Sequence, residues 1–170
     1  VIRKIILEYA AQRRTSLARP LQKGFSEGFK LLSRKAKSVK TVEISASDYS
    51  PSITMDGYDG NWLGRDLSAT EKQHVGLSML YAICKLSRNA LPVVVDTPVS
   101  RMDKEHKGWS VTKFYPKLSH QVIVLTTSDD LSNGLFDELK QANCIGSQIL
   151  LEETGPATAK AVTKTLEEFF

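Results

Sequence analysis

The sequence predicts an α/β fold in which a mostly parallel sheet is flanked by helices and preceded by an N-terminal helical segment. Two observations support this prediction. Apolar residues recur at helical spacing through the first 32 positions, and the rest of the chain alternates short apolar runs with further helical patterns. Alternating strands and helices are typical of a parallel sheet with both faces covered.

The N-terminal helical segment is expected to span residues 1–38, and the sheet-forming region residues 39–170. Proline removes a backbone donor and clashes with the preceding turn, so Pro20 is expected to break or kink the helix or to open a second one. On either side of it, apolar residues mark one helical face: Ile2, Ile5, Ile6 and Tyr9 before it, and Leu21, Phe25, Phe29 and Leu32 after it.

The stretch GFSEG, residues 24–28, matches the G-x-S-x-G nucleophile elbow of hydrolases. An elbow requires a strand before the serine and a helix after it. Here Phe25 and Phe29 continue a helical stripe across the match, so no Ser-His-Asp site is predicted.

The sheet-forming region is divided by turn-forming stretches such as DYSPS and DGYDG. We expect strands at 39–45 and 52–56, buried strands at 92–95, 121–127 and 146–152, and helices from LSATEKQ to about residue 87 and near 103–114, 131–141 and 157–168.

The composition is that of a globular chain with one core, since 170 residues include 41% hydrophobic ones. No apolar run reaches the length of a membrane span and no signal peptide is evident, which predicts a cytoplasmic protein without a membrane partner. Cys84 and Cys144 are too few for a disulfide framework or a zinc site and are interpreted as ordinary buried thiols. Because the chain begins at Val1 without a methionine, we expect a piece of a longer protein.

Charge is distributed unevenly along the chain. Residues 1–40 contain 11 Lys or Arg and 2 acids, a net charge of +9, whereas the remainder carries −5. Such asymmetry is expected of a basic arm near a polyanion such as DNA, and a solvated helical face explains it equally well. The candidate DNA contacts are Arg13, Arg14, Arg34, Lys35 and Lys37.

The stretch LSATEKQ, residues 67–73, begins a predicted helix. Ser68 followed three residues later by Glu71 is a capping box, in which each side chain satisfies a free backbone N–H. The same helix start offers N–H groups and a positive dipole end to a phosphate. On these residues alone, a helix cap and half of a nucleotide site both remain open.

Asp96 ends the apolar run PVVV, where ligands bind in parallel sheets. An acid there can hold Mg²⁺ directly or through water, or it can simply cap a turn. The order of LSATEKQ, a helix of about twenty residues, PVVVDTPVSRMD and VIVLTTSDD favours the first interpretation. A signature helix, a Walker B strand, a D-loop and a switch strand follow one another in this order in ATP-binding-cassette heads.

The region from about Leu67 to Leu131 therefore resembles the C-terminal half of an SMC-like ATPase head. Within that group it is most similar to DndD, the ATPase of bacterial DNA phosphorothioation (DNA sulfur modification). The resemblance rests on LSATEKQ, LPVVVDTPVSRMDKEH and SHQVIVLTTSDD. It implies a C-terminal lobe of such a head over residues 39–170, with residues 1–38 as the end of a coiled-coil arm.

The resemblance also implies ligands and site residues. ATP and Mg²⁺ would be bound between two heads of a homodimer, and DNA and other DNA sulfur modification proteins would be partners. Asp96 is the Walker B aspartate that holds the metal, while Thr97 and Thr127 occupy the positions of the catalytic glutamate and the switch histidine. The signature that contacts ATP on the opposite head is Leu67, Ser68, Ala69, Thr70, Glu71, Lys72 and Gln73, and the D-loop is Ser100, Arg101, Met102 and Asp103.

Three residues depart from the family pattern at the site: Thr70, Thr97 and Thr127. Thr70 stands where the signature usually has glycine, and Thr97 cannot act as a general base at neutral pH unless another group takes its proton. No GxxxxGK[ST] P-loop occurs in the 170 residues. We therefore expect the Walker A lobe of the same protein as a partner, and this chain alone to be inactive.

Two classes of function follow from these residues. The first is an ATPase whose nucleotide-driven dimerisation is coupled to DNA handling in phosphorothioate modification. The second is a nucleotide-gated structural module that closes on DNA with little or no hydrolysis. A generic SMC-like DNA-repair ATPase head is a further alternative.

Overall fold

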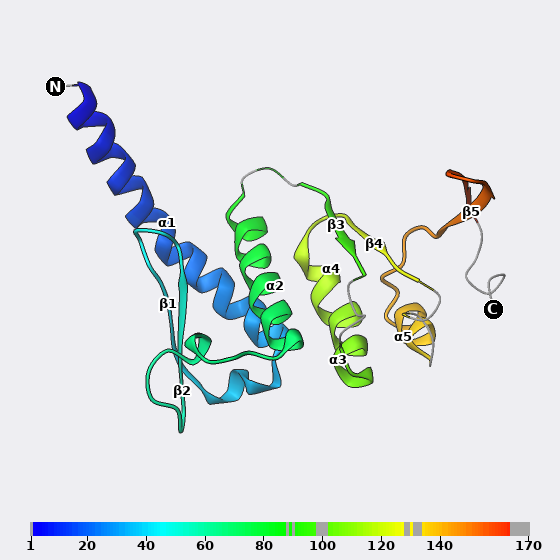
Figure 1. The fold of residues 1–170 in the computed structure, drawn as a ribbon, viewed down its shortest axis with the longest axis horizontal. Helices are drawn as coiled ribbons and strands as arrows, with labels where there is room; N and C mark the ends of the chain where they lie inside the picture. The colour runs from blue at the N-terminus through cyan, green and yellow to red at the C-terminus, as the bar shows by residue number, and fades with distance from the viewer. Residues whose placement is uncertain are drawn as a thin grey trace.

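The computed structural model describes residues 2–87, 89, 91–97, 102–127, 130 and 134–163. It begins with a long helix, α1 (Ile2–Leu32), whose first half projects from the rest of the chain (Figure 1). The apolar residues of that half are exposed, whereas Phe25, Phe29 and Leu32 in the second half are buried. Among the described residues, no helix is long and apolar enough to cross a membrane.

Helix α1 passes through Pro20 without ending, so the predicted break is wrong. An interior proline costs a helix about 3 kcal/mol. The residues directly after Pro20 bury large apolar side chains, beginning with Leu21 and Phe25, and this burial can offset that cost.

Helix α2 (Ala69–Leu86) packs closely against the second half of α1. A Cβ atom added to Gly24 would lie 2.7 Å from the Cα atom of Ala82, and one added to Gly28 would lie 3.1 Å from the Cα atom of Ser78. The two glycines of GFSEG therefore let the helices approach, and the stretch is helical as expected. The face of α2 that meets α1 buries Ser78 and Ala82, whereas Ile83 of the same helix is exposed.

The first sheet pairs β1 (Val39–Ile44) with β2 (Pro51–Met55) in antiparallel orientation. Both strands were predicted at these positions. A short helix η1 (Arg34–Ser38) leads into β1, and a second one, η2 (Trp62–Gly64), follows β2. This sheet covers α1 and α2 and encloses one core cluster. Its buried members are Leu21, Phe25, Phe29, Val42, Ile44, Ile53, Met55, Trp62 and Ala82.

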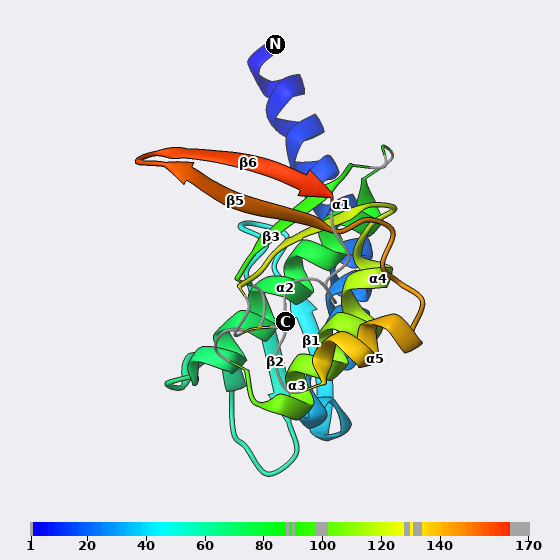
Figure 2. The same ribbon diagram turned by 90° about the vertical axis from the view of Figure 1, so that its right-hand side faces the viewer.

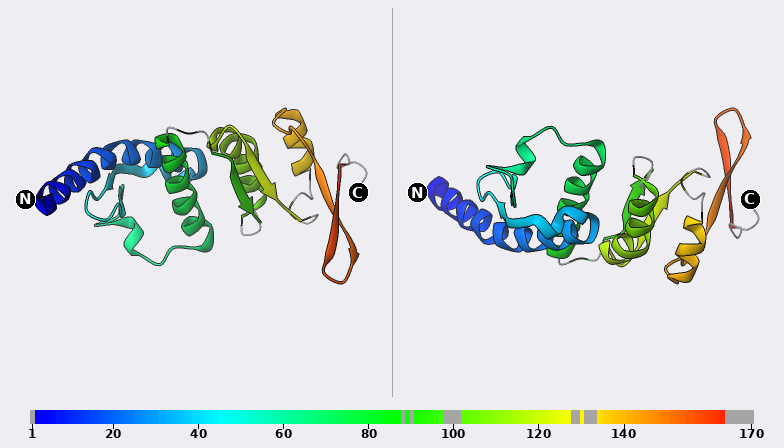
Figure 3. Two further views of the ribbon diagram at one scale, coloured as in Figure 1. Left: turned by 90° about the horizontal axis from the view of Figure 1, so that it is seen from above. Right: turned by 90° about the horizontal axis from the view of Figure 1, so that it is seen from below.

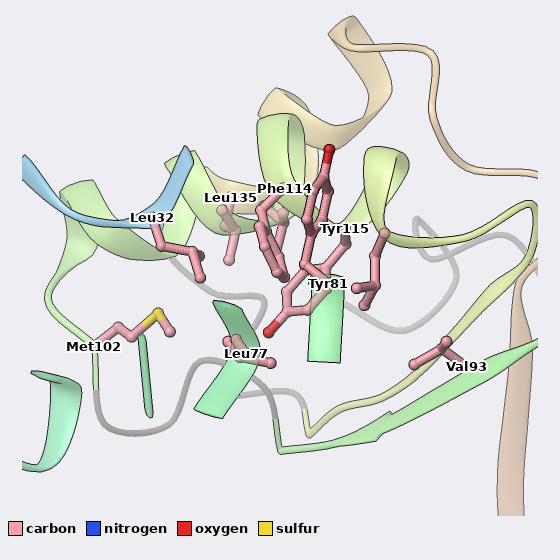
Figure 4. Packing of buried hydrophobic residues seen from close by; sticks show 10 residues of the cluster. Leu32, Leu77, Tyr81, Val93, Met102, Phe114, Tyr115 and Leu135 are labelled. Carbon is pink, nitrogen blue, oxygen red and sulfur yellow. The ribbon is translucent and has the colours of Figure 1, made fainter. Parts of the chain in front are cut away.

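The second sheet pairs β3 (Val93–Asp96) with β4 (Val122–Leu125) in parallel orientation. Between them lies one helical stretch made of α3 (Lys104–Trp109), the π-helical η3 (Ser110–Phe114) and α4 (Tyr115–Leu118), which ends four residues later than predicted. This stretch packs on α2 in a second core cluster (Figure 4). Its buried members are Leu32, Leu77, Tyr81, Val93, Met102, Val111, Phe114, Tyr115, Leu118 and Leu135.

The C-terminal part contains α5 (Leu135–Gln141) and an antiparallel hairpin of β5 (Ile149–Gly155) and β6 (Thr158–Thr163) (Figure 2). The helix predicted near 157–168 is therefore wrong over 157–163, and residues 164–168 lie outside the described ones. Pro156 and Ala157 form the turn after β5, and the β-branched residues that follow favour a strand. The run predicted as a buried strand is exposed at Ile149 and Leu151.

The expected mostly parallel, covered sheet is also wrong. The described strands form three separate two-stranded sheets, of which β3–β4 is the parallel one, and they follow one another along the long axis (Figure 3). Val94 is 59% exposed, Ile123 43% and Leu125 45%, so runs predicted to be buried face solvent. The two cysteines, predicted to be buried, are half-buried.

The close contact of α1 with α2 can be tested by adding one methyl group. Gly24→Ala should lower stability by roughly 1–3 kcal/mol, because the new Cβ atom collides with backbone rather than with a flexible side chain. Chemical denaturation measures this change. Gly76→Ala is the matched control, since nothing lies within 4 Å of a Cβ atom there, and it should stabilise α2 by about 0.5–1 kcal/mol. Equal stability of the two variants would contradict the packing argument.

Candidate functional site

The start of α2 is capped as the sequence predicts. The Ser68 hydroxyl accepts from the Glu71 backbone N–H at 3.3 Å, and the Glu71 carboxylate accepts from the Ser68 N–H at 2.9 Å. Ser68 and Ala69 are exposed, so the end of the helix is open to a ligand. Within the same stretch, Leu67 is half-buried against the first core cluster and Lys72 pairs with Asp66. Thr70 and Gln73 are half-buried.

Glu71 is also the centre of an ion-pair cluster. Lys35 of η1 and Arg65 each lie 2.5 Å from its Oε1 atom, and both cations lie over the ring of Trp62. Burial opposes the charged form of Glu71, but hydrogen bonds from Lys35 and Ser68 outweigh it and hold its pKa at about 2, below the ordinary 4.5. The cap of α2 is thereby tied to the segment that follows α1.

The carboxyl ends of β3 and β4 lie side by side. Asp96 is the register partner of Leu125, and the Thr97 N–H donates to the Leu125 carbonyl at 2.9 Å. Thr127 follows two residues beyond Leu125, so Asp96, Thr97 and Thr127 share one edge of this sheet. All three are exposed there.

Thr97 has an unusual backbone conformation. Its φ angle is +44°, in the left-handed region that a β-branched residue rarely adopts. Such a conformation costs on the order of 1–3 kcal/mol and is concentrated at binding and catalytic sites in known proteins. The strained residue is the one that directly follows Asp96.

Asp130 is a buried carboxylate that sequence reasoning did not single out. Its Oδ2 atom lies 3.2 Å from the Thr127 hydroxyl and 3.5 Å from the Thr127 backbone nitrogen. Its Oδ1 atom lies 4.0 Å from Lys107 of α3. The spacing Thr127-x-x-Asp130 is that of a helix cap, and this was the sequence signal that could have indicated the contact.

The D-loop leads into α3. Ser100 and Arg101 lie outside the described residues, and Met102 is buried in the second core cluster. Asp103 caps α3 by accepting from the His106 N–H at 2.9 Å, and it pairs with Arg34 of η1 at 3.4 Å. The hydrogen bonds from His106 lower the pKa of Asp103.

His74 and His106 form a contact between α2 and α3. Their ring centroids are 5.3 Å apart, and His74 is buried. Burial, with the neighbouring charge of His106, lowers the pKa of His74 to about 4 from 6.5. His74 is therefore neutral near pH 7 and packs as part of the core. Because Arg34 and Lys35 are adjacent, their ion pairs with Asp103 and Glu71 hold the start of α3 near the start of α2.

Of the five candidate DNA contacts, three are exposed basic residues and two form ion pairs within the chain. Arg13 and Arg14 are exposed on the projecting half of α1, and Lys37 is exposed on η1. Arg34 and Lys35 pair with Asp103 and Glu71. These two cations therefore already serve contacts within the chain.

Magnesium fits the edge formed by β3 and β4 as a one-carboxylate site. Mg²⁺ is commonly held by one or two carboxylates, while phosphates and waters complete its shell. Asp96 offers one exposed carboxylate at the carboxyl end of β3. Among the described residues, no group of three or more His, Cys, Asp or Glu could hold a metal by itself. Asp96 would therefore share the ion with nucleotide.

No protein-family model and no curated protein matches the chain. A solved structure from work on ATP-driven dimerisation and DNA-stimulated activation of SMC ATPases is similar to it in fold. The alignment covers 89% of this chain and 87% of the other, with a TM-score of 0.58 and 17% sequence identity. The chain shares the fold of an SMC ATPase. This confirms the helical N-terminal segment and the mixed helix and strand architecture expected from the resemblance.

The ion pairs and hydrogen bonds of Glu71 predict that the fold loses stability in acid. Because the folded-state pKa of Glu71 lies below its ordinary value, its ionised form stabilises the fold above pH 4.5, and this contribution is lost as the pH falls toward about 2. Glu71→Gln should reduce the loss of stability across that window, as measured by thermal unfolding at several pH values. Asp66→Asn is the control, since the Asp66 side chain is 99% exposed. An unchanged acid dependence in Glu71→Gln would count against the cluster.

Proposed function

We propose that this chain is the C-terminal lobe of an SMC-like ATPase head that binds ATP and Mg²⁺ between two dimerised heads and couples this to DNA handling. The observation that supports the proposal best is the edge where Asp96, Thr97 and Thr127 lie at the carboxyl ends of adjacent parallel strands, within the fold of an SMC ATPase. Ligands of open α/β sheets bind at such edges.

The start of α2 is proposed to contact ATP held by the opposite head. Ser68 and the free N–H groups of the first turn would face the γ-phosphate, whose charge the positive end of the helix dipole favours. In the free head Ser68 caps α2. Because the residue is exposed, it can also contact nucleotide in the dimer. Thr70, in place of the usual glycine, adds a side chain to this contact surface.

Asp96 is proposed to hold the magnesium ion of Mg-ATP directly or through water. The bound ion neutralises charge on the phosphate oxygens during phosphoryl transfer. Thr127, from the end of β4, lies at the same edge, where its hydroxyl donates to Asp130 Oδ2 and its oxygen can accept from a water molecule beside the phosphate. Thr97 supplies no carboxylate, so hydrolysis is expected to be slow compared with a head that has the usual glutamate.

The Walker A lobe of the same protein is the proposed structural partner. Residues 39–170 would form one lobe, and residues 1–38 the returning end of a coiled-coil arm. The exposed apolar side chains of β3 and β4, such as Val94 and Leu125, need a covering element. The same lobe would bring the P-loop that these 170 residues lack.

The more specific proposal is a DndD-like role in DNA phosphorothioation, with a second head, DNA and other DNA sulfur modification proteins as partners. It rests on the sequences LSATEKQ and LPVVVDTPVSRMDKEH. The alternative function is a nucleotide gate that closes on DNA with little hydrolysis, and Thr70 and Thr97 favour it. ATP turnover by the complete protein, measured with and without DNA, separates the two.

The metal role of Asp96 predicts that Asp96→Asn leaves the fold intact, because this side chain is exposed. In the complete protein, the variant should lose Mg²⁺-dependent nucleotide turnover by at least about tenfold, since an amide is a weaker ligand than a carboxylate. Asp66→Asn, another exposed acid, is the matched control. Unchanged Mg-ATP turnover in Asp96→Asn would exclude the assignment.

The signature role of Ser68 predicts an effect on dimerisation. Ser68→Arg places a bulky cation where the opposite head must fit, so ATP-dependent dimers should be lost while ATP binding to the open head changes little. Ser68→Ala is the control, because both variants lose the cap, at about 1 kcal/mol. Size measurements with and without ATP, beside a nucleotide titration, test this. Normal ATP-dependent dimers of Ser68→Arg would leave the helix cap as the whole role of Ser68.

A further inference from the structure

We propose that Asp130 is the proton acceptor missing at Thr97, and that it acts through the hydroxyl of Thr127. This inference rests on the proposed function, because it concerns the water that attacks ATP. A hydroxyl can take a proton from water only if another group takes its own proton. A carboxylate bonded to a threonine at the nucleotide edge supplies such a group.

The Thr127–Asp130 pair has the geometry that this transfer needs. The Thr127 hydroxyl lies 3.2 Å from Asp130 Oδ2, and Asp130 is only 5% exposed. Thr127 itself is exposed. The hydroxyl therefore stands between an open edge of the sheet and a buried carboxylate. When its proton points to Asp130, the lone pairs of its oxygen remain free to accept from a water molecule.

The backbone holds the pair in this arrangement. The Asp130 N–H donates to the Thr127 carbonyl at 3.2 Å, and the Thr127 nitrogen lies 3.5 Å from Asp130 Oδ2. Thr127 lies two residues beyond the end of β4. Since Asp96 is the register partner of Leu125, Thr127 lies at the same edge as the proposed metal ligand.

Lys107 supplies a counter-charge for the carboxylate. Its Nζ atom lies 4.0 Å from Asp130 Oδ1, so the lysine and the threonine contact different oxygens of the same group. Lys107 belongs to α3, whose first turn is capped by Asp103 of the D-loop. The acceptor is thus held from two sides, by the end of β4 and by the helix that follows the D-loop.

In the proposed step, the water oxygen bonds to the γ-phosphorus while the bond from phosphorus to the leaving ADP oxygen breaks. One water proton moves to Thr127 Oγ1, and the Thr127 proton moves to Asp130 Oδ2. Thr127 is unchanged at the end, and the protonated Asp130 returns its proton to the phosphate product or to solvent.

A purely structural role for Asp130 makes a different prediction. The spacing Thr127-x-x-Asp130 resembles the cap formed by Ser68 and Glu71, and a cap needs only a hydrogen-bond acceptor. Asparagine keeps an acceptor oxygen but cannot take a proton at neutral pH. Asp130→Asn therefore distinguishes a capping role of Asp130 from a role as proton acceptor.

The test uses the complete protein, with its Walker A lobe. Asp130→Asn should lower kcat for ATP about 100-fold or more with KM changed less than about twofold, while ATP-dependent dimers persist. Asp130→Glu should restore part of the activity. Thr127→Val should match Asp130→Asn, whereas Thr127→Ser, which keeps the hydroxyl, should stay active. Thr126→Val is the control, because the Thr126 hydroxyl bonds to the Thr127 carbonyl rather than to a carboxylate.

Each outcome decides the proposal. Wild-type turnover by Asp130→Asn would overturn the relay and leave the ATPase function standing. If Asp130→Asn fails to fold, equal turnover by Thr127→Val and Thr127→Ser would overturn it instead. A wild-type protein that forms ATP-dependent dimers without hydrolysis would exclude the relay and favour the nucleotide gate. A complete protein that binds no ATP would exclude both the relay and the proposed function.

Discussion

The close approach of α1 and α2 requires residues without a Cβ atom at positions 24 and 28, and glycine occupies both. On α2 they face the backbone of Ser78 and Ala82 and the Cβ atom of Tyr81. A larger residue at either glycine would push the helices apart along the whole contact. The end of α1 would then move with it, and Arg34 and Lys35, which follow that end, would no longer meet their acids.

The ion pairs at this junction differ in strength because they differ in burial. Arg34 and Asp103 are both more than half exposed, and such pairs contribute about 1 kcal/mol or less. Glu71 is only 15% exposed and has two cations at 2.5 Å. A shift of α1 relative to α2 would therefore be felt most strongly at Glu71, which also holds the cap of α2. The start of α2 is therefore the part of the candidate site most closely linked to the long helix.

Local signals predicted α2 with its cap and the strands β1 to β4, because these depend on residues close in sequence, but they gave a helix where β6 lies. The periodicity of Phe25 and Phe29, and the pair Ser68 and Glu71, each specify one turn of helix at a time. Contacts between distant residues could not be predicted in this way: Arg34 and Asp103 are 69 residues apart. Nothing in the sequence pairs His74 with His106, and only the packing of α2 on α3 brings the two rings together. Strand burial failed because an apolar run does not reveal whether a neighbouring element covers it.

The exposed faces of β3 and β4 link the completion of the sheet to the completion of the site. A two-stranded sheet has too little buried surface to be stable by itself, and Val94 and Ile123 face solvent here. Asp96 and Thr127 stand at the carboxyl edge of this same sheet. An element that packs over these strands covers apolar surface and at the same time brings new groups to that edge. Burial of the strands therefore supplies free energy that can order the groups around a nucleotide, and the two events are expected to occur together.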